Sequence, residues 1–175
     1  MKTQTITNQE RFFGDDEIIV SKTDLTGHIT YANKIFLSIA DFQEDEVLGQ
    51  PHSLIRHPHM PRAIFKLLWE TLEKKHEIFA YVKNRAKNGD HYWVIAHVTP
   101  SKNAAGQIIG YHSNRRVPDK SVLDETIIPL YQDLQKSEQE ENRKEGLERS
   151  YQKLTAMLRN KGLEYDEFIA NVMKN

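Results

Sequence analysis

Hydrophobic and polar positions change their spacing in the first part of the chain. A short β-type run over residues 17–22, turn-forming residues at 24–27 and a second run over 28–31 predict a hairpin. From Asn33 onward apolar residues recur at helical spacing, and three acidic residues just before Val47 predict another short helix. The folded part of the chain is therefore expected to begin with two strands and to continue with helices.

A proline-rich loop and a longer helix follow. Residues 51–61 include three prolines and three histidines, which interrupt regular structure and predict a fixed, irregular loop. Apolar residues then repeat at helical spacing from Ala63 to about Lys75. This segment is expected to be the main helix of the domain.

Three further β-type runs, separated by turn-prone segments, cover residues 78–84, 91–100 and 108–117. Sequential hairpins at this end make an antiparallel sheet, and the two earlier strands add to its other side. The helices must then cover one face of that sheet. We predict an α+β fold, with a five-stranded antiparallel sheet, helices on one face and a cavity between them.

The composition changes beyond Pro118, where charged residues dominate. Four apolar positions at four-three-four spacing predict a short amphipathic or coiled-coil helix, at Leu147, Tyr151, Leu154 and Leu158. Gly162 interrupts it, and residues 165–173 outline one more short amphipathic helix. The repeat is too short for a self-sufficient coiled coil, so it is expected to pack on the domain or on a partner. The predicted organisation is an arm over 1–16, a domain over 17–118 and C-terminal helices over 119–175.

Composition narrows the classes of function. The net charge of −1 gives no electrostatic excess of the kind that marks nucleic-acid or anionic-membrane binders. The sequence offers neither the run of about 20 apolar residues that a membrane span needs nor the apolar centre of a signal peptide, so a cytoplasmic protein is expected. Phosphate-loop, nucleophile-elbow and zinc motifs are missing from the sequence, which predicts a protein that is not an enzyme.

Three segments resemble the PAS family: GHITYANKIF at 27–36, the loop from Gly49 to Pro61 with its LIRHPHMP phrase, and VKNRAKNGDHYWV at 82–94. More narrowly, they are similar to the flavin-binding PAS domain of Aer-type aerotaxis receptors and to PAS-only partners of energy-taxis receptors. The resemblance implies a sensor domain that holds FAD non-covalently and reports redox or oxygen status to a chemoreceptor. Because the chain has no cysteine, it cannot form a covalent cysteinyl adduct with a flavin.

The resemblance assigns cofactor binding to five positions of this chain: Asn33, Arg56, His57, Trp69 and Asn84. Arg56 offers a planar charged fork suited to a pyrophosphate, and His57 offers a hydrogen-bonding ring beside it. The two asparagines can present donor and acceptor to a flavin edge or a ribose, and Trp69 can stack on a ring.

Each position also has a structural alternative. Arg56 and His57 can tie down the proline-rich loop through carbonyl hydrogen bonds, Asn33 can cap a helix, and Trp69 can belong to the core. His112 and Asn114 share one face of the last strand and, by alternation, face either a ligand or water.

Other functions remain open at this point. A haem-binding PAS sensor is the alternative ligand hypothesis, because eight histidines supply candidate axial ligands. The His-x-His pair in the loop lacks acidic or thiolate companions at ligand spacing, so no metal site is predicted. A ligand-free scaffold that dimerises through its terminal helices is the other alternative. In the sensor reading, a redox change shifts the last strand, and the C-terminal helices carry the signal to a chemoreceptor or another output protein.

Overall fold

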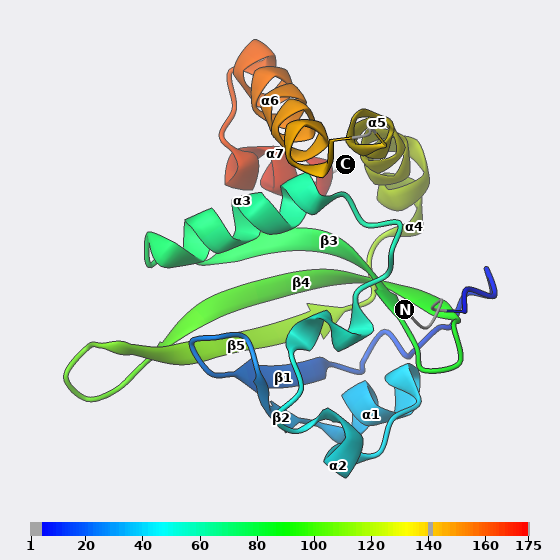
Figure 1. Ribbon diagram of the computed structural model, residues 1–175, viewed down its shortest axis with the longest axis vertical. Helices are drawn as coiled ribbons and strands as arrows, with labels where there is room; N and C mark the ends of the chain where they lie inside the picture. The colour runs from blue at the N-terminus through cyan, green and yellow to red at the C-terminus, as the bar shows by residue number, and fades with distance from the viewer. Residues whose placement is uncertain (1–4, 140–141, 175) are drawn as a thin grey trace.

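The computed structural model describes residues 5–139 and 142–174 of the chain (Figure 1). Within these residues five strands form one antiparallel sheet in the order β2-β1-β5-β4-β3. The strands are β1 (Ile19–Thr23), β2 (Ile29–Ala32), β3 (Ile78–Arg85), β4 (His91–Lys102) and β5 (Ile108–Arg116). The predicted α+β fold with a five-stranded antiparallel sheet is confirmed.

The segment between β2 and β3 covers one face of the sheet (Figure 1). It consists of α1 (Lys34–Ala40), α2 (Glu44–Val47), a 3₁₀ turn η1 (His52–Ile55) and α3 (Arg62–Glu73). Alternating strand residues face these helices, and the resulting core includes Ile19, Phe36, Ile55, Ile64 and Val94, each with at most 1% of its surface exposed. Apolar side chains at helical and two-residue spacing therefore meet in one layer, as the sequence pattern predicts.

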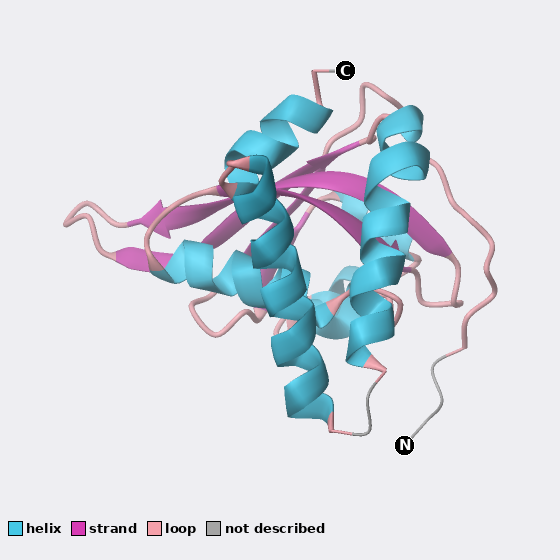
Figure 2. Ribbon diagram, turned by 90° about the horizontal axis from the view of Figure 1, so that it is seen from above, coloured by secondary structure: helices cyan, strands magenta, loops and turns pink. Residues whose placement is uncertain are grey.

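The C-terminal segment forms a second helical layer beside the edge strand β3 and the outer side of α3 (Figures 1 and 2). It contains α4 (Lys120–Val122), a π-helical turn η2 (Leu123–Ile127), α5 (Ile128–Glu138), α6 (Arg143–Lys161) and α7 (Tyr165–Val172). Within this part of the described chain, no helix is long and apolar enough to cross a membrane, and the same holds for the other described helices.

The helices α6 and α7 lie where the sequence predicts them, and Gly162 ends α6 in the left-handed conformation. The sequence did not predict α5, because Pro129 and scattered charges obscure its apolar stripe. Proline is nevertheless compatible with its position in the first turn of α5. The buried side chains of Tyr131 and Leu134 anchor this helix, and the Tyr131 hydroxyl donates to the Tyr81 carbonyl on β3 at 2.7 Å.

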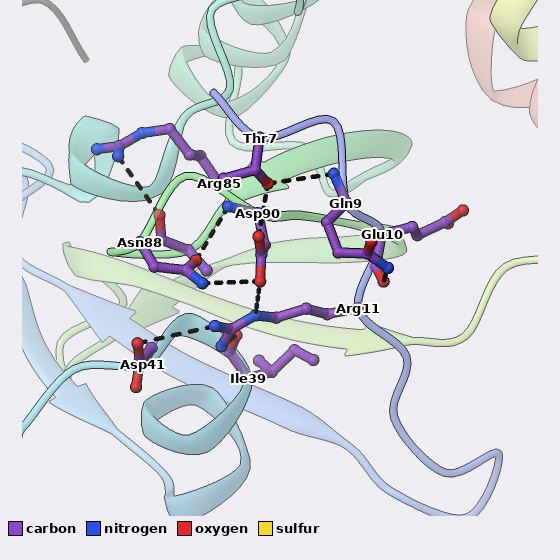
Figure 3. Close-up of polar contacts among 10 residues, drawn as sticks. Thr7, Gln9, Glu10, Arg11, Ile39, Asp41, Arg85, Asn88 and Asp90 are labelled. Atoms are coloured by element: carbon purple, nitrogen blue, oxygen red, sulfur yellow. Dashed lines mark hydrogen bonds and ion pairs between the residues drawn. The ribbon is translucent and has the colours of Figure 1, made fainter. Parts of the chain in front are cut away.

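The N-terminal arm runs along the turn between β3 and β4 (Figure 3). Its backbone pairs with β4, since the His91 amide donates to the Gln9 carbonyl and the Arg11 amide to the His91 carbonyl. Arg11 forms an ion pair with Asp90 at 2.8 Å and donates to the Ile39 carbonyl at the end of α1. The arm thereby ties the β3–β4 turn to the first helix.

Candidate ligand cavity

A cavity of about 240 Å³ lies between the inner face of the sheet and the helical segment. Strands β1, β3, β4 and β5 supply its floor, and η1 and the cavity-facing side of α3 supply its walls. The apolar part of the lining includes Ile55, Phe65, Leu68, Trp69, Leu72, Val82, Ala96 and Val98. The polar part includes Ser21, Thr23, Thr26, His52, Ser53, Arg56, Asn84, Tyr111, Ser113 and Arg115.

The polar lining is positively charged. Arg56 and Arg115 both face the cavity, and among the described residues that line it none is an aspartate or glutamate. Arg115 is 2% exposed, and burial lowers its pKa from 12.5 to about 10, which leaves it charged at neutral pH. Burying a charge without an opposite charge is costly, so this arrangement favours an occupant that brings negative charge or several acceptors.

Arg115 is held at one end of the cavity by two partners. Its Nη2 donates to Ser21 Oγ at 2.6 Å and lies 2.7 Å from His52 Nε2. Because a guanidinium can only donate, His52 Nε2 must be an acceptor, and the ring proton resides on Nδ1. Burial, and then the charges of Arg115 and Arg56, lower the pKa of His52 to about 3. His52 is therefore neutral at physiological pH and orients the arginine.

Several buried donors facing the cavity have no hydrogen-bond partner in the described part of the chain. They are the Nη1 of Arg115, the Nε of Arg56, the Nδ2 of Asn84 and the hydroxyl of Thr23. Buried polar groups are usually hydrogen-bonded. A buried group without a protein partner often binds a ligand or an ordered water. Three of these four groups can only donate, so the complementary occupant must carry acceptors.

Three of the five predicted site residues line this cavity: Arg56, Trp69 and Asn84. Arg56 stacks over the ring of Phe65 with its guanidinium carbon 3.7 Å from the ring centre, and a backbone bridge joins it to Asn84 on β3. Trp69 meets Tyr111 edge-on across the cavity at 5.5 Å between ring centres. The loop thus places a charged, an aromatic and an amide group around one space, and their contact with a ligand remains a prediction.

The structure places Asn33 and His57 outside the cavity lining. The Asn33 side chain caps α1, because its Oδ1 accepts from the amides of Phe36 and Val20 and its Nδ2 donates to the Ile18 carbonyl. Through these three bonds the side-chain amide joins β1 to the first helix. In the structure Asn33 therefore acts as the N-cap of α1, and its side chain does not line the cavity.

His57 is fully buried beside the cavity wall, and its Nδ1 accepts the backbone amide of His59 at 3.1 Å. The rings of His59 and His91 meet it edge-on, and burial together with nearby positive charges lowers its pKa to about 3. No group of three histidines or acidic residues is arranged to hold a metal within residues 5–139 and 142–174. His57 is therefore neutral, and its hydrogen bond with the His59 amide stabilises the loop.

Sequence reasoning missed Ser21, His52 and Arg115 as lining residues, and it left open which face of β5 meets the cavity. His112 Nε2 and Asn114 Oδ1 lie 2.9 Å apart, but neither residue lines the cavity. The cavity-facing residues of β5 are instead Tyr111, Ser113 and Arg115. An apolar-and-small alternation in the neighbouring strand, Val94, Ala96 and Val98, was the available signal for which face is buried.

Comparison with known proteins gives a consistent family assignment. Residues 29–115 match the model of the PAS fold. The aerotaxis receptor of Escherichia coli K12 is 42% identical over 130 residues, which cover 74% of this chain and 25% of that receptor. The biofilm dispersion protein BdlA of Pseudomonas aeruginosa is 28% identical over 87 residues, which cover 49% of this chain and 21% of that protein. The chain thus spans about a quarter or less of the length of these relatives.

Solved structures show the same fold. A light-oxygen-voltage domain, solved in a study of a flavin analogue, superposes with a TM-score of 0.55 at 19% identity. The superposition covers 66% of this chain and 87% of that domain. At this level of identity the likeness establishes the arrangement of strands and helices.

Proposed function

Because the chain carries a PAS domain of the Aer-type branch, we propose that it is a redox or oxygen sensor that binds FAD non-covalently in this cavity. A sensor domain of the PAS family is established by the family match and by the aerotaxis relative. The proposal adds the cofactor, the energy-taxis role, a location in the cytoplasm and the absence of catalysis. Its partner is a chemoreceptor or another signalling protein reached through the C-terminal helices, and a homodimer remains a prediction.

The observation that carries the proposal is the buried Arg115, whose Nη1 has no hydrogen-bond partner among the described residues, in a cavity whose described lining contains no aspartate or glutamate. The pyrimidine side of an isoalloxazine ring offers a row of carbonyl and nitrogen acceptors, and the ring gains electron density when it is reduced. Arg115 and Asn84 would hold that edge, the aromatic walls would enclose the ring, and Arg56 would face the pyrophosphate. The cavity volume of about 240 Å³ suits a ring, with the remainder of the dinucleotide at the cavity mouth.

Haem is less compatible with the same lining. His52 is the only histidine among the described residues that line the cavity, and its Nε2 already accepts from Arg115 at 2.7 Å. To serve as an axial ligand it would have to release the arginine and leave a buried guanidinium without its acceptor. A planar ring that is held by hydrogen bonds at its edge needs no such exchange. This comparison favours FAD over haem as the occupant.

Two connections lead from the cavity to the C-terminal helices. Strand β5 carries Arg115 and runs directly into Pro118 and α4, while α3 carries Trp69 and also contacts α6. A change in the charge of the ring would alter the hydrogen bonds of Arg115 and Asn84, and so bias the position of these elements.

Hydrogen–deuterium exchange of the FAD-loaded protein, measured oxidised and after reduction by dithionite, tests this sensor mechanism. We expect reduction to change the exchange rates of amides in α5 and α6, since both helices rest on cavity-forming elements. The matched control is the same reductant added to protein without FAD, where exchange must remain constant. Identical protection of these helices in both redox states would exclude the C-terminal helices as the output element.

A further inference from the structure

Helix α3 has no N-terminal cap of its own. Its first residue follows Pro61, which supplies no side-chain hydrogen bond, so the free amides of the first turn need an acceptor from elsewhere. Glu138, the last residue of α5, provides it: its two carboxylate oxygens accept the backbone amides of Arg62 at 2.9 Å and Ala63 at 3.0 Å. The C-terminal layer thus caps a helix of the domain.

The same carboxylate forms an ion pair with the side chain of the residue that it caps. Arg62 Nε lies 3.1 Å from Glu138 Oε2, and the Glu138 side chain is only 9% exposed. Arg62 also donates to the carbonyl of Arg143 at 2.8 Å, at the start of α6. One pair of residues therefore joins α3 to the end of one C-terminal helix and the beginning of the next.

The position of Glu138 depends on the small size of Gly146, because the two residues approach each other closely. A Cβ atom built at Gly146 on α6 would lie 3.1 Å from the Glu138 carbonyl oxygen and 3.2 Å from its Cα. These distances are tighter than ordinary packing, so a larger residue at 146 would displace the backbone of Glu138 from α6 and disturb the position from which Glu138 caps α3. The close approach of α5 and α6 and the capping of α3 are parts of one arrangement.

Helix α3 carries this arrangement to the cavity. Arg62, Lys66 and Glu70 occur every fourth residue on the side of α3 that faces the C-terminal helices, where Glu70 accepts from the Tyr151 hydroxyl of α6. The adjacent face of α3 supplies Phe65, Leu68, Trp69 and Leu72 to the cavity. A displacement of α3 at its capped end therefore moves the cavity wall.

We propose that Glu138 is a positioning residue for the ligand: by capping α3 it holds the cavity wall in its binding geometry and couples occupancy of the cavity to docking of the C-terminal helices. This inference rests on the proposed function for the identity of the ligand. The coupling itself is a property of the chain. Linkage requires it to be reciprocal, so the cap strengthens binding by the same factor by which binding strengthens docking.

The test compares Glu138→Ala with Glu125→Ala, which removes an exposed carboxylate from the same C-terminal segment. Fluorescence titration of each 175-residue protein with FAD should give a dissociation constant about 5- to 10-fold higher for Glu138→Ala than for the control, on the scale of one lost charge-assisted cap. Gly146→Ala should weaken binding in the same direction. If Glu138→Ala is too unstable to titrate, Glu138→Gln, which keeps one carbonyl acceptor, takes its place.

Amide exchange distinguishes positioning from simple stabilisation. FAD should slow exchange in α5 and α6 of the control several-fold and have a smaller effect in Glu138→Ala. Equal FAD affinity in both variants, or equal protection by FAD of α5 and α6, would overturn the coupling. If none of the proteins binds FAD, the proposed function fails, while unchanged exchange at the amides of residues 62 and 63 in unliganded Glu138→Ala would separately overturn the cap.

Discussion

Arg115 and His52 lie 2.7 Å apart at the inner end of the cavity, with the guanidinium as donor and the neutral imidazole as acceptor. The pair leaves the Nη1 of Arg115 without a partner among the described residues, although Arg115 is almost fully buried. Such a group weakens the unliganded fold and strengthens binding of an electron-rich ligand. Replacing Arg115 should therefore raise the stability of the unliganded protein and lower its affinity for the ligand.

Arg115→Met should make the unliganded protein more stable by about 1–3 kcal/mol, because methionine fills similar space without a buried, uncompensated charge. The same variant should lower FAD affinity by at least tenfold, since it removes the main donor to the ring. Urea unfolding and FAD titration measure the two effects. Arg116→Met is the control, because Arg116 is exposed on the adjacent position of β5. A variant that binds FAD as well as the wild type would contradict the assigned role of Arg115.

The histidine of this pair predicts an acid-dependent loss of stability. The folded protein protonates His52 only near a pKa of about 3, whereas the unfolded chain does so near 6.5. Between these values the unfolded state binds more protons, so the free energy of unfolding falls as pH is lowered, by about 1.4 kcal/mol per pH unit for one such histidine. The groups that face His52 are Ser21, Arg115 and Arg56.

His52→Gln should therefore flatten the fall in stability between about pH 6 and pH 4. Urea unfolding at several pH values measures the slope, with the exposed His76→Gln as a control. His57 is expected to contribute a slope of the same sign, so a residual dependence should persist in the His52 variant. An unchanged slope in His52→Gln would show that this ring is protonated with equal ease in the folded and unfolded states.

The two tryptophans of the chain provide an internal comparison for the location of the ligand. Trp69 lines the cavity, whereas Trp93 lies near Tyr131 with its ring centre 6.1 Å from that of the tyrosine. Electron transfer from an indole in contact with an excited flavin shortens the flavin emission lifetime. Trp69→Phe should lengthen the emission lifetime of bound FAD, and Trp93→Phe should leave it near the wild-type value. The reverse result would place the ring on the other face of the sheet.

Asp90 holds the N-terminal arm through Thr7 and Arg11, and it also accepts from Asn88 within its own turn (Figure 3). These hydrogen bonds lower the pKa of Asp90 to about 2, so the carboxylate and its contacts persist above pH 3.8 and are lost as pH falls toward 2. Asp90→Asn should raise amide exchange in residues 7–11 several-fold. Asp15→Asn, an exposed change in the same arm, is the control and should not alter exchange there.

The sequence pattern was sufficient for the sheet and for α3, because alternation and helical spacing are local properties. It did not determine which face of β5 is buried: a shift of one residue exchanges Ser113 and Arg115 for His112 and Asn114, and both sets contain polar residues. The register with β4, which pairs Val98 with Ser113, places Ser113 and Arg115 on the face that meets the cavity.

Long-range capping was also beyond the sequence. Glu138 follows Arg62 by 76 residues. In the sequence, a glutamate near the end of a charged helix cannot be distinguished from a solvent-exposed one. Asn33 shows the converse, since a residue that the family resemblance assigned to the cofactor is used in this fold as an N-cap. His52 was visible as one of three loop histidines, but its position opposite Arg115 depends on η1 packing over β5.

The absorption spectrum of the purified 175-residue chain, followed by acid release and identification of any chromophore, shows whether the protein holds FAD. We expect the two-banded visible spectrum of an oxidised flavin and release of intact FAD, with both signals much reduced in Arg115→Met and retained in Arg116→Met. A haem spectrum, or a colourless protein that does not take up added FAD, would contradict this expectation.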